Sequence, residues 1–210
     1  GTTFSGTTVF LTSDISLSGT FKPIGYWNSG SDNHDFKGVF DGQGYVISGL
    51  KVEGSGSNYA GLFGWSDGTT IRNVVLDSSC SIKSGKHDSN SNIYAGGIIA
   101  YCGDSGPCKI ENCVNMAPIS YSLTSITLNV ILGGIAGTLA AGSSASVIVK
   151  NCANYGSVSR SGSNSGWSAV GGIVGYIDKL TNTKQIQNCL NYGTVSQSSG
   201  SSVHSSIGGI

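Results

Sequence analysis

The chain has 210 residues, of which only 10% are charged, and its 11 basic and 11 acidic side chains leave no net charge. This balance argues against a basic surface for nucleic acid or anionic lipid, and no apolar run approaches the ~18 residues of a membrane-spanning helix. A hydrophobic content of 38%, with regularly spaced Val, Ile, Leu and aromatic residues, favours a packed core over disorder.

The N-terminal part of the chain predicts strands without a clear repeat. Apolar and polar residues alternate at 9–25 and again at 36–52, and the dipeptide Asp41-Gly42 is a turn signal. We expect residues 1–56 to form one or two irregular leading coils that cap this end. Residues 57–210 should continue the same domain as regular repeats.

Two motifs then recur in a common phase. The first is rich in Gly and apolar residues and occurs as AGLFGW (60–65), AGGIIAY (95–101), GGIAGT (133–138), VGGIVGY (170–176) and IGGI (207–210). Steps of 36, 37, 38 and 37 residues separate its marker glycines, Gly61, Gly97, Gly134, Gly172 and Gly209. The second occurs as IRNVVL (71–76), IENCVN (110–115), VKNCAN (149–154) and IQNCLN (186–191), with first asparagines 39, 39 and 37 residues apart. Such a period is typical of a repeat architecture.

Each repeat predicts short strands and no helix. Its apolar runs are rich in β-branched residues, are bounded by Gly, Asn and Ser, and lack a sustained helical period. A single unit cannot bury its apolar face, whereas stacked units can, each strand pairing with its copy in the next coil. We therefore predict an all-β, parallel β-solenoid (β-helix) with coils of about 37 residues, right-handed by the general preference for parallel crossovers.

The Asn-Cys pair of the second motif predicts a corner. Polar residues precede the asparagine and face solvent, whereas the first repeat has Val74 where the others have Cys, which indicates a buried position. An asparagine in the left-handed conformation would turn the chain and reset the alternation. The stacked side chains would form ladders of Asn73, Asn112, Asn151 and Asn188, and of Cys113, Cys152 and Cys189 as buried thiols. Asn115, Asn154 and Asn191 are candidates for another ladder.

Two further cysteines bracket a turn-rich stretch. Cys102 and Cys108 enclose GDSGP, which predicts a disulfide, with a pair of free thiols as the alternative. The spacing fits neither a zinc ribbon nor a redox Cys-x-x-Cys motif, and Cys80 has no obvious partner. Six Cys in a chain rich in Ser, Thr and Gly predict a secreted or cell-surface protein.

The Gly-rich motifs resemble the GLUG motif of bacterial and some eukaryotic surface proteins. The string from LTSDISLSG through FKPIG, FKGVFDGQGYVISGLKV, YAGLFGW and TIRNVVL is similar to the segment that opens such arrays, and the likeness covers nearly the whole chain. The resemblance implies a repeat region of secreted adhesin-like proteins, or a non-catalytic part of immunoglobulin A1 metallopeptidases. The zinc motif His-Glu-x-x-His of those enzymes is absent from the sequence, so no catalytic residue carries over.

The acidic residues argue against an enzyme. Solenoid lyases and hydrolases need clustered carboxylates, but Asp178 is the only acid after Glu111. One polar cluster, Asp32, His34, Asp35 and Asp41, is more typical of a solvated loop than of a calcium site, which needs more oxygen ligands. His87 and His204 lie in Ser-rich loops. We expect no catalytic residue, no metal site and no cofactor.

Three functions remain. The first is a non-catalytic extracellular structural protein, a fibre or stalk segment that associates through its solenoid ends. The second is an adhesin module that binds a glycan or a host surface protein through loop aromatics, with Trp27, Trp65 and Trp167 as the candidates, although most such residues are packing residues. The third is the non-catalytic repeat region of a larger secreted enzyme. Neither nucleic-acid binding nor membrane insertion is expected.

Overall fold

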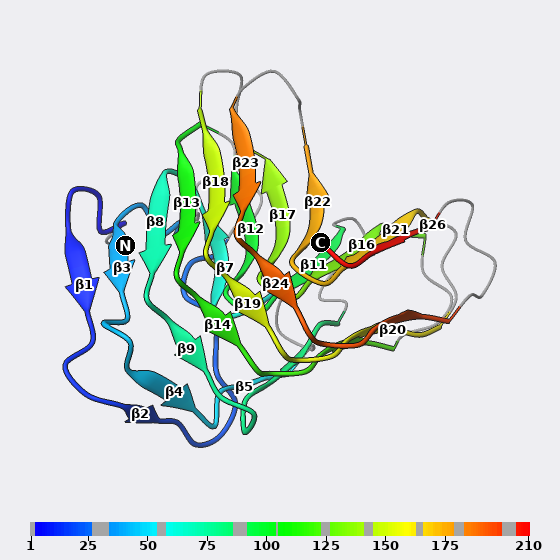
Figure 1. The fold of residues 1–210 in the computed structure, drawn as a ribbon, viewed down its shortest axis with the longest axis horizontal. Helices are drawn as coiled ribbons and strands as arrows, with labels where there is room; N and C mark the ends of the chain where they lie inside the picture. Colours follow the sequence, from blue (N-terminus) through cyan, green and yellow to red (C-terminus); the bar gives the residue numbers. More distant parts are fainter. Residues whose placement is uncertain are drawn as a thin grey trace.

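The computed structural model describes residues 3–26, 34–53, 58–85, 92–103, 105–122, 127–140, 145–162, 166–178, 183–198 and 205–210. These residues form 26 strands and contain no helix, and hence none long and apolar enough to cross a membrane. All pairing between the strands is parallel, and the strands fall into five sheets that we name A to E in chain order (Figure 1).

Sheet A consists of β1 (Thr8–Phe10), β3 (Val39–Asp41), β8 (Thr69–Arg72), β13 (Cys108–Glu111), β18 (Val147–Lys150) and β23 (Lys184–Gln187). Sheet B consists of β2 (Ile15–Ser16), β4 (Val46–Ser48), β9 (Val75–Leu76), β14 (Val114–Asn115), β19 (Ala153–Asn154) and β24 (Leu190–Asn191). Sheet C consists of β5 (Lys51–Val52), β10 (Ser81–Lys83), β15 (Ile119–Tyr121), β20 (Val158–Arg160) and β25 (Val195–Gln197).

Sheet D consists of β6 (Tyr59–Ala60), β11 (Ile93–Gly96), β16 (Val130–Gly133), β21 (Ser168–Gly171) and β26 (Ser205–Gly208). Sheet E consists of β7 (Phe63–Ser66), β12 (Ile99–Gly103), β17 (Ala136–Ala140) and β22 (Val174–Ile177). Four complete coils, β3–β7, β8–β12, β13–β17 and β18–β22, therefore contribute one strand to every sheet. β1 and β2 precede them, and β23 to β26 follow.

Matching residues of successive coils lie directly above one another. In sheet A, Ile71 pairs with Ile110, and Ile110 pairs with Val149. All three side chains have no exposed surface, and burial of each contributes about 1.5–3 kcal/mol. This register confirms the parallel β-solenoid predicted from the repeat.

The regular stack extends into the segment that we expected to be irregular. β3, β4 and β5 pair in register with β8, β9 and β10, so the shared scheme starts before residue 57. The preceding chain follows the same path less regularly, through β1, β2 and the single bridges from Thr20 to Lys51 and from Ile24 to Phe63. These leading residues remain partly exposed because a coil at the end of the stack has a neighbour on one side only.

The Gly-rich motif bends the chain between sheets D and E. A Cβ atom at Gly133 would overlap the carbonyl oxygen of Ala136, and one at Gly134 would overlap the carbonyl of Gly172, so both positions require glycine. The bend brings the outward faces of the two sheets together at a concave corner. Tyr94 of sheet D and Tyr101 of sheet E meet there, with ring centroids 5.0 Å apart.

Candidate functional site

The first asparagine of each Asn-Cys motif lies at a corner in the left-handed conformation, with φ between 51° and 55° at Asn73, Asn112, Asn151 and Asn188. Their side chains form a hydrogen-bonded ladder. The Nδ2 of Asn112 donates to Oδ1 of Asn73 at 3.0 Å, Asn151 donates to Asn112 at 3.0 Å, and Asn188 donates to Asn151 at 3.2 Å. Every amide thus donates toward the N-terminal end.

Asp41 terminates this ladder at its N-terminal end. Its Oδ1 accepts from Nδ2 of Asn73 at 2.9 Å, and its Oδ2 accepts from Nε of Arg72 at 2.8 Å. Although burial opposes ionisation, these hydrogen bonds and one from the backbone N–H of Gln43 hold the pKa of Asp41 below its usual value. Our sequence-based interpretation of Asp41 as a turn residue did not include this role.

The second asparagine column runs in the opposite direction. Nδ2 of Asn115 donates to Oδ1 of Asn154, and Nδ2 of Asn154 donates to Oδ1 of Asn191, both at 2.9 Å. Each amide also donates to a carbonyl two residues ahead, as Asn154 does to Gly156 at 2.8 Å. Asn115 and Asn154 have no exposed surface, so these hydrogen bonds satisfy polar groups that would otherwise be costly inside the core.

The cysteines that follow the corner asparagines point into the core as free thiols, stacked below Val74 of the preceding coil. Cys113 and Cys152 are at most 1% exposed, whereas Cys189, in the last coil, is 8% exposed. Contact with the Cys113 thiol and burial together raise the pKa of Cys152 to about 12, so the thiol stays protonated. Its Sγ donates to the carbonyl of Lys150 at 3.3 Å.

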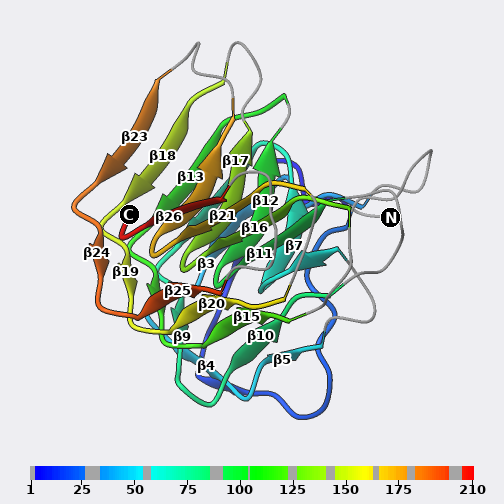
Figure 2. The ribbon, with the colours of Figure 1, turned by 90° about the vertical axis from the view of Figure 1, so that its right-hand side faces the viewer.

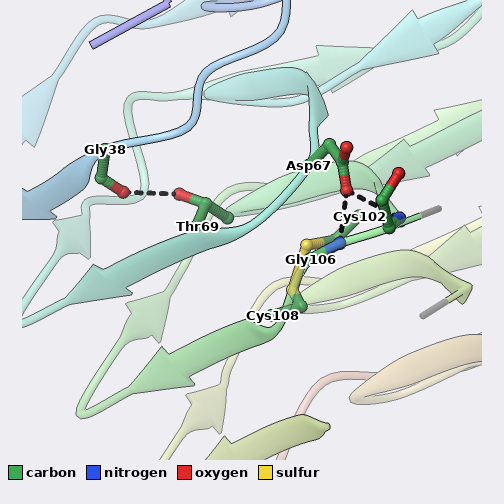
Figure 3. Close-up of a disulfide and its surroundings, with 7 residues drawn as sticks. Gly38, Asp67, Thr69, Cys102, Gly106 and Cys108 are labelled. Atoms are coloured by element: carbon green, nitrogen blue, oxygen red, sulfur yellow. Dashed lines mark hydrogen bonds between the residues drawn. A yellow bond between two sulfur atoms is a disulfide. The ribbon is translucent and has the colours of Figure 1, made fainter. Parts of the chain in front are cut away.

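Cys102 and Cys108 are joined in a disulfide at the turn between β12 and β13 (Figure 3). The carboxylate of Asp67, from the coil before, faces this turn and accepts the backbone N–H groups of Ser105 and Gly106, each at 2.8 Å. Burial disfavours the charge of Asp67, but these hydrogen bonds hold its pKa below the usual value. The disulfide and the carboxylate together order an otherwise Gly- and Ser-rich turn.

The N-terminal polar cluster separates into unrelated contacts. Asp35 pairs with Lys37 at 3.0 Å, Asp41 belongs to the ladder, and the ring of His34 packs on Tyr26 with centroids 4.9 Å apart. Asp32, His87 and His204 lie outside the described residues. Within the part of the chain that the structure describes, no three His, Cys, Asp or Glu side chains are grouped to hold a metal ion.

Aromatic residues gather in the concave corner between sheets D and E. Trp65 stacks on Tyr101 with centroids 4.1 Å apart and is only 8% exposed, which leaves little of its surface for a ligand. Trp167 packs against Tyr176 at 4.9 Å. Trp27 lies outside the described residues. Tyr94 and Tyr176 also line this corner and were not predicted from the sequence, although Tyr94 precedes and Tyr176 follows the Gly-Gly pair of its repeat.

The last coil is open on its C-terminal side. β23 and β24, orange at one edge of the stack in Figure 2, have a paired neighbour on one side only. Leu190, Tyr192 and Ile207 are 55%, 66% and 58% exposed. In the preceding coil the counterpart of Ile207, Val170, is buried and that of Leu190, Ala153, is half-buried, whereas that of Tyr192, Tyr155, is itself exposed. This coil therefore presents apolar side chains together with unpaired strand edges.

Comparison with known proteins yields two similarities. No protein-family model matches the chain, so the likeness to the GLUG repeat stays a prediction. Over 80 residues, or 33% of the chain, the sequence is 36% identical to halomucin of Haloquadratum walsbyi, and the match spans only 1% of that protein. A crystal structure from Bacteroides ovatus, of a protein provisionally named immunoglobulin A1 protease, aligns over 97% of this chain and 78% of its own with 20% identity and a TM-score of 0.41. That score is too low to support a shared function.

Proposed function

We propose that the chain is a non-catalytic structural segment of an extracellular fibre or stalk in which coils stack end to end. The supporting observation is the open C-terminal coil. Strand edges that lack a neighbour favour continued pairing. A next coil would also cover Leu190 and Ile207 further, and because both are already partly covered each would contribute less than the ~1.5–3 kcal/mol of complete burial.

The two asparagine ladders support a next coil of the same kind. Among the described residues, no group donates to Oδ1 of Asn188, and Nδ2 of Asn191 donates only to the carbonyl of Gly193, at 2.9 Å. A further coil with the Asn-Cys-x-Asn string would donate to Asn188 and accept from Asn191. The open end thus has a donor and an acceptor in the positions that its own repeat would satisfy.

We also infer an extracellular location, from the disulfide and the low content of charged residues. The Cys102–Cys108 disulfide is a feature of oxidising compartments, and the charge-poor surface fits a secreted or surface protein. The partial likeness to halomucin favours the same assignment. After Glu111 the only acidic residue is Asp178, so this half of the chain has no pair of side-chain carboxylates. This motivates the non-catalytic part of the proposal.

Sedimentation velocity over a range of concentrations tests this proposal. We expect the wild-type chain to associate as its concentration rises, and Leu190→Lys with Ile207→Lys to remain monomeric, because a charge cannot be buried at the contact without a partner. Met116→Lys is the matched control, since Met116 is 37% exposed in the middle of the stack rather than at its end. A wild-type chain that stays monomeric at all concentrations would contradict the proposal.

The same measurement distinguishes two geometries. Phe10 is 58% exposed on β1, at the opposite end of the stack. If the C-terminal coil of one copy meets the N-terminal coil of the next, Phe10→Lys will also block association, and the wild type will form a series of growing species. If two C-terminal coils meet, Phe10→Lys will dimerise like the wild type.

A further inference from the structure

We propose that the concave corner between sheets D and E binds a neutral sugar ring at a place where one aromatic pair is missing. In three of the four complete coils, an aromatic residue in or next to the strand of sheet D contacts an aromatic residue of sheet E across the corner. These pairs are Tyr59 with Trp65, Tyr94 with Tyr101, and Trp167 with Tyr176, with ring centroids 5.3, 5.0 and 4.9 Å apart.

The coil of β16 and β17 breaks this pattern. Its residue opposite Tyr94 is Ile131, and its residue between Tyr101 and Tyr176 is Thr138. Because neither side chain fills the space of an aromatic ring, a hollow of about 230 Å³ opens here, and both flanking pairs line it. In sheet E the hollow is therefore the missing step in a column whose other members are Trp65, Tyr101 and Tyr176. In sheet D the position after Ile131 is Ala169, and the ring of that coil comes from Trp167, just before the strand.

The height of the hollow suits one flat ring. Tyr101 and Tyr176 lie two coils apart, or about 10 Å at the usual strand spacing. A ring midway between them would lie about 5 Å from each, similar to the 4.1 Å between the stacked rings of Trp65 and Tyr101. The volume is also below the ~300–1,000 Å³ of pockets for larger ligands, which favours a single sugar unit.

A buried hydroxyl at the base of the hollow lacks a partner. Thr138 is 3% exposed, and its Oγ1 forms no hydrogen bond. Such a group is costly when left unsatisfied. Because the oxygen atom itself has less than 1 Å² of exposed surface, a sugar hydroxyl in the hollow would satisfy it after rotation of the Thr138 side chain toward the hollow. The equivalent positions of the other coils are aromatic, namely Trp65, Tyr101 and Tyr176. A threonine hydroxyl therefore occurs in this column only in the coil where the hollow lies.

Two polar side chains at the hollow complete the site. Asn92 is held in place, since its Oδ1 accepts from the backbone N–H of Asn129 at 3.2 Å and its Nδ2 donates to the hydroxyl of Tyr94 at 3.2 Å. Asp178, whose backbone N–H donates to the carbonyl of Leu139 at 2.9 Å, supplies the one carboxylate of the lining. A carboxylate accepts hydrogen bonds from hydroxyl groups and repels anions.

These features identify the class of ligand. The apolar faces of a sugar ring match the two tyrosine rings, while its hydroxyl groups match Thr138 and Asp178. Phosphorylated, sulfated or sialylated sugars are disfavoured by the carboxylate. An aromatic side chain or a base could stack between the rings but would offer no hydroxyl groups to the two oxygen partners.

Glycan binding by the intact chain tests the inference. The probes are an array of neutral hexose and N-acetylhexosamine glycans with sialylated and sulfated counterparts, followed by titration of the strongest neutral monosaccharide by saturation-transfer NMR. Thr138→Tyr should abolish binding, because it supplies the missing ring, and the same column already carries Tyr at 101 and 176. Tyr176→Ala should weaken binding about tenfold, and Thr138→Val about three- to tenfold.

Tyr155→Ala is the matched control, since Tyr155 is an exposed ring on another face that stacks on Tyr192. It should bind within about twofold of the wild type. Circular dichroism and the thermal midpoint establish that each variant is folded. Failure of every neutral glycan to bind, preference for anionic glycans, or unchanged binding by folded Thr138→Tyr would each overturn the inference. Binding of free tryptophan by a chain that binds no sugar would overturn it as well.

Discussion

Single asparagine residues hold the corners of this solenoid through both backbone and side chain. A left-handed backbone costs roughly 1–2 kcal/mol for most residues and less for Asn, whose side chain bonds locally. At Asn112 and Asn151 the side chain in addition both donates and accepts along the ladder. The same residue thus makes the turn and links three coils.

Replacement of Asn151 separates these two contributions. Asn151→Ala should lower the free energy of unfolding by roughly 2–3 kcal/mol, since it loses two ladder hydrogen bonds and forces a Cβ-bearing residue without local bonding into φ 54°. Asn151→Gly should cost about 1 kcal/mol less, because glycine adopts this conformation freely. Urea denaturation measures both. An alanine variant as stable as the glycine variant would show that the backbone conformation contributes nothing.

The buried thiol of Cys152 makes stability depend on pH. Its pKa is about 12 in the folded chain, against ~8.5 for an unfolded cysteine, so its contribution is complete below pH ~8.5 and is lost as the pH rises toward 12. Urea denaturation between pH 8 and 10.5 should show wild-type stability falling more steeply than that of Cys152→Val. Valine is the matched replacement because the first coil has Val74 in this column. Equal slopes would mean that the thiol does not titrate on unfolding.

At the scale of elements, the strands are too short to be stable alone, and turns with defined contacts determine where each one begins. The turn between β12 and β13 is closed by the Cys102–Cys108 disulfide and held by Asp67 from the preceding coil. The bend between sheets D and E depends instead on the absence of side chains at Gly133 and Gly134. Local chemistry thus sets the path of each coil before neighbouring coils bury it.

Removal of the disulfide tests the turn. Loss of this short cross-link in Cys102→Ala with Cys108→Ala should lower the free energy of unfolding by roughly 2 kcal/mol, from the extra freedom of the unfolded chain. Thiol titration of the denatured, unreduced wild type should find four reactive cysteines, Cys80, Cys113, Cys152 and Cys189. Six reactive thiols would contradict the pairing.

At the scale of the whole molecule, each coil contacts its neighbours above and below, so stability is close to a sum over adjacent coils. In an interior coil Val170 is only 1% exposed, whereas its counterpart Ile207 in the last coil is 58% exposed. An architecture of this kind has no intrinsic end, and its termini are where a further coil or a second copy can add. The association experiment with Leu190→Lys and Ile207→Lys belongs to this scale.

Much of the fold could be predicted from the repeat alone. Since a strand that pairs with its own copy puts like residues together, the spacing of Asn112, Asn151 and Asn188 specified the register and their corner position. The cap by Asp41 could not be predicted, because its coil lacks the Asn-Cys string and its partner Asn73 follows 32 residues later. The regular stacking of β3 to β5 went unrecognised for the same reason.

The sequence by itself determined the parallel solenoid, the buried column of Cys113 and Cys152 and the asparagine corners, because periodic spacing transfers directly into stacking. Only the tertiary structure decided which side chains meet across the bend between sheets D and E. Tyr101, Thr138 and Tyr176 come from three different coils, and their common surface depends on the angle at which two sheets meet, which no local pattern of residues encodes. A ring that is absent from such a column becomes visible only once the column has been assembled.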